Sequence, residues 1–492
     1  MIRKRNRIWR RLLAIGLASL VLAAFGTTAH AQGPTPTPAT QAAVDTTWVL
    51  ATGFLVFFMQ CGFAMLETGL IRQTSAVNAL LENFIDAGIT AVAFWAVGFG
   101  IAFGTDTAGL IGTSNFFLSD AVKFAGGAVQ YSQTGTIDTV SFFFFQFAFA
   151  ATASTITTGA MAERTDYIGD LIYSAIMGAI SYPIIVHWAW GGGWLAQQGF
   201  HDFAGSTVVH TVGGVTAIVG AYMLGPRPVR FGKDRKWQPL PPAHNLGLAT
   251  IGTMILWFGW YGFNPGSTLG MGNTGLVGLV VLNTTLGAAG GTLSAQIFQY
   301  FRTRKWDLSA SLNGSLAGLV AITAGCAFVA PWAALLIGLV AGVIVLLAVD
   351  AVERVRIDDP VGAFAVHGAC GIWGTLAIGL VGQPGLTWAP AGVDVATRAG
   401  LLLGGGPGLL VVQFIGSLAT VVFTAVFAFV MFGALKAVSR LHVNKIVDDV
   451  TIFIDDFEHG ATVMPDIRPP AVVPEPSVIR GQASQALPSS GD

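Results

Sequence analysis

Two stretches of the chain, DFAGSTVVHTVGG at 202–214 and DPVGAFAVHGACG at 359–371, carry one pattern. In each, an aspartate precedes a histidine by eight residues, and glycines follow the histidine. Membrane transporters built from two inverted repeats place their central site where the repeats meet, near the middle of the bilayer. The two stretches therefore predict that His210 and His367 come together inside such a protein.

The composition requires a lipid environment. Hydrophobic residues make up 53% of the 492 residues and charged residues 10%, whereas soluble domains carry about 25% charged residues. The 63 glycines also indicate a membrane protein, because small residues let membrane helices pack closely. A net charge of −1 provides no basic surface for nucleic acid.

Eleven apolar stretches are long enough to cross a bilayer, which takes about 20 residues in a helix. They lie near 48–70, 77–103, 139–161, 168–189, 206–224, 247–265, 274–299, 309–329, 332–351, 361–382 and 408–435. The predicted fold is an all-α polytopic membrane protein with eleven transmembrane helices. Two inverted five-helix repeats are followed by a final helix.

Basic residues test this topology, because Lys and Arg concentrate in cytoplasmic loops. With the N-terminus outside and the C-terminus in the cytoplasm, fifteen basic residues fall in inner loops and two in outer loops. The inner ones are Arg72, Arg164, Arg227, Arg230, Lys233, Arg235, Lys236, Arg302, Arg304, Lys305, Arg354, Arg356, Lys436, Arg440 and Lys445, and the outer ones are Lys123 and Arg398.

The N-terminal residues 1–31 match a signal peptide. Six basic residues between Arg3 and Arg11 precede an apolar run at 12–26, and Ala29-His30-Ala31 fits the small-x-small cleavage rule. A Pro/Thr-rich extracellular linker is expected at 32–47, the membrane domain at 48–435, a cytoplasmic C-terminal region at 436–464 and a disordered tail at 465–492. The signal predicts a prokaryotic inner (cytoplasmic) membrane.

The histidines are the leading functional candidates, because ionisable groups inside a bilayer are costly and rare. A single buried histidine is more often structural, but two at matching positions favour a function. A neutral imidazole donates from one nitrogen and accepts at the other, so a pair can line a path for a small polar molecule or pass a proton. No further ligand accompanies them at metal-binding spacing, and we expect neither metal nor cofactor.

Aromatic and polar residues cluster near the outer ends of the spans. Trp190 and Asp202 could together attract a cation, because tryptophan faces favour positive charge. An interfacial aromatic belt is the alternative for the tryptophans, and a helix cap is the alternative for Asp202. The phenylalanine-rich stretch at 142–149 and WYGFNPGS at 260–267 supply rings for a constriction that excludes hydrated ions.

Several motifs make the chain resemble the Amt/Mep/Rh ammonium transporter family across nearly all of 48–435. These are the stretch 202–210 continuing to Arg227, GAMAER at 159–164, WGGG at 190–193, GFN at 262–264 and VHGACG at 366–371. The resemblance implies a homotrimer in a lipid bilayer, with one ammonium or ammonia pore in each subunit.

The resemblance also assigns roles to individual residues. Trp190, Ser267 and Phe149 would bind ammonium outside, supported by Asp202. Phe149 and Phe263 would form the pore gate. Phe149 is placed by its distance from Glu163, and Phe147 stays as the alternative. His210 and His367 would be the paired pore histidines and relay a proton.

The C-terminal region departs from the family pattern. DDFEHG at 455–460 keeps part of it, but Ile454 stands near an expected Gly-Leu pair and no tyrosine follows. The resemblance implies a PII-type regulator, and these departures argue against one here. The predicted function is an ammonium transporter or channel rather than an enzyme. The alternatives are an ammonium sensor with little flux and a channel for neutral ammonia gas.

Overall fold

The computed structural model describes residues 37–125, 128–230, 236–388, 395–396, 399–443 and 454–463. It divides the chain into a short unit, Met1–Gln41, and a large unit, Ala42–Asp492. The predicted signal peptide, the first residues of the predicted linker and the predicted C-terminal tail lie outside the described residues.

Long helices account for most of the large unit. Some are continuous rods: α2 Pro38–Leu70, α5 Thr139–Met161, α10 Leu246–Gly266, α11 Thr274–Thr303, α12 Leu308–Thr323, α13 Pro331–Arg354 and α15 Gly408–Ala437. Others contain one π-helical turn: α3 Ala76–Ala93 with η2 Phe94–Gly98 and α4 Phe99–Phe103; α6 Tyr167–Ile176 with η4 Met177–Ser181 and α7 Tyr182–Ala189; η5 Ser206–Thr211 with α9 Val212–Leu224; and η7 Phe364–Ala369 with α14 Cys370–Val381. A short α8, Trp194–Gln197, precedes η5.

Ten helices in the described part of the chain are long and apolar enough to cross a membrane. They match ten of the eleven expected spans. The exception is the eighth, expected at 309–329, which is the shorter helix α12 of 16 residues. Turns follow its end at Thr323, so the apolar run continues without helical backbone and the count of eleven is not confirmed. Helix α2 begins at Pro38, before the expected boundary at 48, because proline is well suited to the first helical position.

Polar residues placed just before the helices fix where several of them begin. Asp138, Asp166, Asn245, Asn273 and Asp307 each accept a hydrogen bond from a backbone N–H in the first turn of the helix that follows. Such caps satisfy N–H groups that have no partner within the helix. These caps mark the start of five helices in the described part of the chain.

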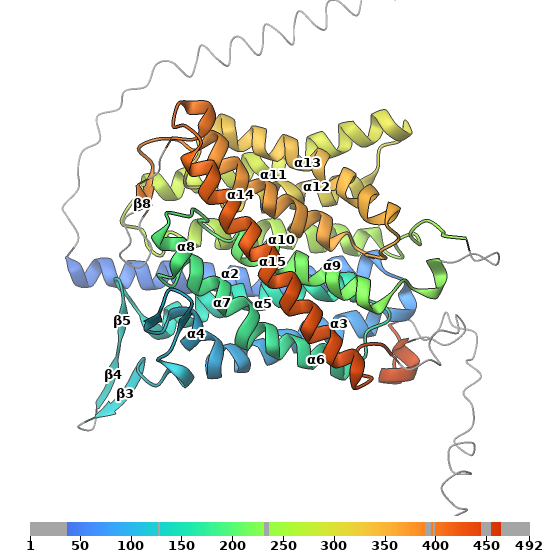
Figure 1. Ribbon diagram of the computed structural model, residues 1–492, viewed down its shortest axis with the longest axis horizontal. Coiled ribbons are helices and arrows are strands. Elements are labelled where there is room, and N and C mark those ends of the chain that lie inside the picture. The colour runs from blue at the N-terminus through green and yellow to red at the C-terminus, as the bar shows by residue number, and fades with distance from the viewer. Residues whose placement is uncertain are drawn as a thin grey trace, which may run out of the picture. The chain divides into compact units, whose positions relative to one another are not determined.

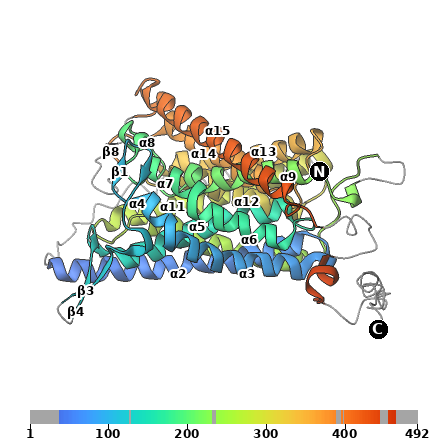
Figure 2. The ribbon, with the colours of Figure 1, turned by 60° about the horizontal axis from the view of Figure 1, so that its bottom comes forward.

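The helices form two groups with matching contacts. Helix α3 packs against α5 and α6, and α11 packs correspondingly against α12 and α13. The groups meet where α9 contacts η7 and α14 contacts η5. In Figure 1, α11–α14 occupy the upper part and α2–α7 the lower part, while α15 crosses obliquely over both. Figure 2 places α15 on the side away from α2 and α3. This arrangement agrees with two repeats and a final helix.

Short antiparallel hairpins connect the helices at one end. They pair β1 Asp106–Thr107 with β2 Ile111–Gly112, β3 Val122–Ala125 with β4 Ala128–Tyr131, β5 Gln133–Thr134 with β6 Ile137–Asp138, and β7 Thr387–Trp388 with β8 Val395–Ala396. Single 3₁₀ turns occur at η1 Gln73–Ser75, η3 Phe116–Leu118, η6 Pro228–Arg230 and η9 Leu401–Leu403. The first three hairpins precede α5.

A buried ion-pair network joins the loops at the predicted cytoplasmic end. The guanidinium of Arg227 lies 2.7 Å from Glu163 Oε1 and donates two hydrogen bonds to Asp358, at 2.7 and 2.9 Å. Arg72 also pairs with Glu163. Burial alone would raise the pKa of Asp358, but its hydrogen bonds and ion pair with Arg227 hold that pKa below its usual value. Several residues counted as inner-loop charges are thus structural.

We expect Asp358→Asn to lower the free energy of unfolding by about 3 kcal/mol, because removing one member of a buried ion pair leaves its partner uncompensated. Thermal unfolding of the purified protein in detergent measures this. The control is Asp350→Asn, which breaks a partly exposed pair with Arg302 and should cost less than about 1 kcal/mol. Equal effects of the two substitutions would contradict the prediction.

The described C-terminal segment, residues 454–463, contacts the same end of the helices. Asp455, in η11 Asp455–His459, accepts hydrogen bonds from the backbone N–H groups of Val77 and Asn78 at the start of α3. Glu458 accepts from the N–H of Tyr167 at the start of α6. Burial raises the pKa of Glu458 and lowers the pKa of His459. Carboxylates at helix N-termini are favourable, so this segment is held in place.

Candidate functional site

Two aspartates orient the helices that carry the histidines. Asp202 Oδ1 accepts from the N–H groups of Gly205 and Ser206, and its Oδ2 accepts from those of Thr207 and Val208, at 2.8–2.9 Å. Asp359 does the same for Gly362, Ala363 and Phe364, all at 3.0 Å. The spacing of eight residues therefore places each histidine about one turn inside a capped helix.

Glycines allow the two capped helices to meet. A Cβ atom on Gly214 would lie 2.2 Å from the backbone nitrogen of Gly368, which no side chain permits. Gly205 adopts φ +114°, a conformation that favours glycine. The glycines that follow each histidine in the sequence thus have a packing role at the junction of the two halves.

His210 and His367 lie in direct contact. Their Nδ1 atoms are 3.1 Å apart and their rings are stacked at 5.2 Å with an interplanar angle of 26°. Both side chains are buried. One Nδ1 must donate while the other accepts, so the pair holds opposite tautomers when neutral. The predicted meeting of the two histidines agrees with this geometry.

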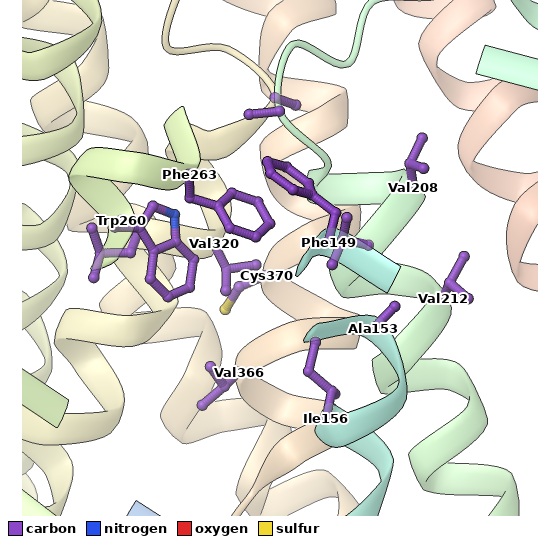
Figure 3. Packing of buried hydrophobic residues seen from close by; sticks show 14 of the residues in the cluster. Phe149, Ala153, Ile156, Val208, Val212, Trp260, Phe263, Val320, Val366 and Cys370 are labelled. Atoms are coloured by element: carbon purple, nitrogen blue, oxygen red, sulfur yellow. The ribbon is translucent and has the colours of Figure 1, made fainter. Parts of the chain in front are cut away.

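Aromatic rings continue the stack on one side of His210. Trp260 lies 5.1 Å from the His210 ring and Phe263 lies 5.4 Å from it, both nearly parallel. Phe149 stacks on Phe263 with ring centroids 4.0 Å apart. Figure 3 shows these two phenyl rings facing one another, with Trp260 beside Phe263. Phe147, the alternative from the sequence, packs against Phe57 and Phe144 instead.

A cavity of about 310 Å³ opens on the other side of the Phe149–Phe263 pair. Its lining includes Phe149, Trp190, Phe203, Ser267 and Gln146. The Ser267 hydroxyl donates to the carbonyl of Phe263 at 2.8 Å, which leaves its oxygen as an acceptor toward the cavity. Trp190 contacts Phe149 edge to face at 6.1 Å.

Asp202 lies behind this cavity and is not among its lining residues. Its backbone carbonyl accepts a 2.7 Å hydrogen bond from Trp190 Nε1, so its loop fixes the orientation of the indole. Burial raises the pKa of the Asp202 carboxyl to about 6, against the opposing effect of its four backbone N–H donors. The capping interpretation made from the sequence is confirmed, and the attraction of a cation by this carboxylate stays a prediction.

A smaller cavity of about 20 Å³ lies next to His367. Phe63, Leu66, Glu67 and Ile156 are among its lining residues. The histidine pair therefore lies between a wide cavity on the predicted outer side and a water-sized cavity on the predicted inner side.

The sequence did not single out Trp260, Phe63 or Glu67 as site residues. Trp260 precedes Phe263 by three residues and so shares its helix face, a signal that could have found it. Nothing in the sequence places Phe63 and Glu67 beside His367. Among the described residues no group of three His, Cys, Asp or Glu side chains is arranged to hold a metal ion.

The fold and the site define a multi-pass membrane protein with a buried imidazole pair between two cavities. The family model for the Ammonium Transporter Family matches residues 47–464. The ammonium transporter Amt2 of Archaeoglobus fulgidus is 39% identical over 438 residues, which cover 86% of this chain and 88% of that one. Ammonium transporter 3 of Dictyostelium discoideum is 34% identical over 424 residues, covering 85% and 94%.

Solved structures give the same result. One named "Sensor Amt Protein" matches with a TM-score of 0.74 at 37% identity, covering 84% of this chain and 98% of that one. Candida albicans Mep2 matches with a TM-score of 0.72 at 29% identity, covering 82% and 87%. The chain belongs to the ammonium transporter family. Its relatives are named as transporters, which points away from an enzyme.

Proposed function

We propose that this protein takes up ammonium at the outer cavity and passes ammonia or ammonium between Phe149 and Phe263 to the histidine pair. The observation that carries the proposal is the order of these elements: a cavity lined by Trp190 and Ser267, then a stacked phenyl pair, then His210 and His367. Each element suits one step in moving a small N–H donor.

The outer cavity suits ammonium recognition. The indole of Trp190 attracts a cation through its ring face, and the Ser267 oxygen accepts a hydrogen bond. Asp202 positions the indole and contributes charge from behind it. Potassium cannot donate hydrogen bonds, so a site that combines a ring face with a directed acceptor distinguishes ammonium from an ion of similar size.

The path beyond the phenyl pair suits a species that has given up its charge. Carrying an ion through a dry, apolar path costs several kcal/mol, and transferring a proton to an imidazole avoids that cost. The rings of Trp260 and Phe263 cover one face of His210 and exclude water from it. We propose that the two imidazoles relay the proton and order the passing molecule.

We extend the proposal to the assembly and its orientation. The protein forms a homotrimer in the inner membrane of a prokaryote, with its N-terminus outside and its C-terminus in the cytoplasm. Large apolar side chains exposed on α15, among them Val426 and Val430, provide surface for lipid or a neighbouring subunit. Lys and Arg positions in the sequence support the orientation.

Sensing with little flux is a second candidate. The neighbour named "Sensor Amt Protein" is 37% identical to this chain. Residues 454–463 are held against α3 and α6, so occupancy of the pore could change a contact that a partner protein detects.

We expect purified protein in liposomes to give a current on an ammonium pulse and none on a potassium pulse.

Replacing Trp190 with Leu should raise the half-saturating ammonium concentration about tenfold, because the cation–π contribution is about 1–2 kcal/mol. The control is Trp188→Leu, since Trp188 lies outside the cavity lining and donates to the carbonyl of Leu110. Absence of current from correctly assembled wild-type protein would favour the sensor or a channel for neutral ammonia.

A further inference from the structure

The inner cavity brings a carboxyl group next to the pore histidines. Glu67, near the end of α2, and His367, in η7, both line this space of about 20 Å³. That volume admits a molecule the size of water or ammonia. Most of the other lining residues are apolar, including Phe63, Leu66 and Ile156. A small molecule leaving His367 on this side therefore meets Glu67 as an ionisable neighbour.

Neutral hydrogen-bond donors hold the Glu67 carboxyl in place. Thr158 Oγ1 donates to Glu67 Oε2 at 2.8 Å, and Asn83 Nδ2 donates to the same oxygen at 2.9 Å. Glu67 is 3% exposed. Its hydrogen-bonding partners carry no positive charge, unlike the partners of Glu163 at the ion-pair network. A buried carboxyl without a cation is costly in its charged form, so Glu67 favours binding a proton that is delivered to it.

We propose that Glu67 is the proton-binding group on the inner side of the histidine pair. This inference rests on the proposed function and assigns its exit step. Phe63 contacts His367 with ring centroids 6.1 Å apart and lies one helical turn before Glu67 on α2. The carboxyl of Glu67 provides the neighbouring acceptor.

The step conserves protons and charge. One proton leaves ammonium on the outer side and passes through His210 and His367 to the Glu67 carboxylate, which becomes a neutral carboxylic acid. The ammonia that follows through the pore enters the inner cavity and takes this proton. Ammonium then leaves and the carboxylate is restored, so no other acid or base is consumed.

The distinguishing test separates charge movement from ammonia movement. Wild-type and Glu67→Gln proteins are reconstituted in liposomes and given an ammonium pulse. Charge is measured as a transient current, and the total entry of ammonia and ammonium is measured with ¹⁵N-labelled ammonium. We expect E67Q to lose about tenfold in current while its ammonia entry stays within about twofold of wild type. Glu67→Asp should restore part of the current.

Glu82→Gln is the matched control, because Glu82 is an equally buried carboxyl on α3 that does not line the inner cavity. It should retain both signals. If E67Q is not recovered as folded protein, Glu67→Met, which is of similar size and uncharged, should give the same separation.

Two results would overturn the assignment. In the first, E67Q carries the same current as the wild type. In the second, E67Q and E67M lose current and ammonia entry equally, and E67D restores neither. The second result would assign Glu67 to helix packing alone. A wild-type protein without ammonium current would instead refute the proposed function, so the two failures are distinguishable.

Discussion

Replacing both His210 and His367 with alanine is expected to reduce the ammonium-specific current about a hundredfold, the contribution typical of a positioned proton-transfer group. The two imidazoles are joined through their Nδ1 atoms at 3.1 Å, and no other ionisable side chain adjoins the Phe149–Phe263 pair among the lining residues of the outer cavity. Without them no proton acceptor adjoins the phenyl pair, so the cost of carrying a charge past it returns.

The measurement is the current of the double variant in liposomes, with ammonium and potassium pulses compared. The space left by two imidazoles admits water, so we expect the remaining current to discriminate less between the two ions. The control is H244A, because His244 bonds to Ile71 and lines neither cavity. Unchanged current and selectivity after removal of both pore histidines would refute the relay.

Replacing Asp202 with alanine is expected to abolish transport and to reduce the yield of folded protein. Four backbone N–H groups would lose their acceptor at once, and each buried donor without a partner costs about 1–3 kcal/mol. The loop whose carbonyl holds Trp190 would also lose its anchor. Size-exclusion chromatography measures folding, and ammonium current measures function.

Asp359→Ala is the comparison, because Asp359 caps the matching helix but lies in the other half of the chain. It should cost similar stability, while its recovered fraction should bind ammonium at the outer cavity with unchanged affinity. A D202A protein with normal yield and normal affinity would contradict both roles of Asp202.

The pKa of Asp202 gives this prediction a dependence on pH. Because burial raises that pKa to about 6, the carboxylate charge is present above pH 6 and is lost below it. The half-saturating ammonium concentration should therefore rise as the external pH falls through about 6, and Asp202→Asn should remove this rise. The free energy of unfolding depends on pH in the opposite direction. The raised pKa of Asp202 stabilises the folded state at low pH, and this contribution is lost as the pH rises through about 6. Protonation of Asp202 is thus not expected to unfold the protein in acid.

The class of the protein, ten of its spans and the meeting of the two histidines are predictable from the order of residues in the chain. These follow from local chemistry: apolar length, the positions of Lys and Arg, and an aspartate eight residues before a histidine in each half. The glycines after each histidine were visible as well, although the close approach of Gly214 to Gly368 gives them their reason.

The tertiary structure alone decided which side chains surround the path. It placed Phe149 rather than Phe147 against Phe263, laid Trp260 on His210, ended α12 at Thr323 and brought Glu67 to the inner cavity beside His367. Each of these depends on how helices far apart in the chain rotate and pack. In apolar helices with little difference between their faces, residue spacing does not reveal that rotation; the close packing of neighbouring helices determines it.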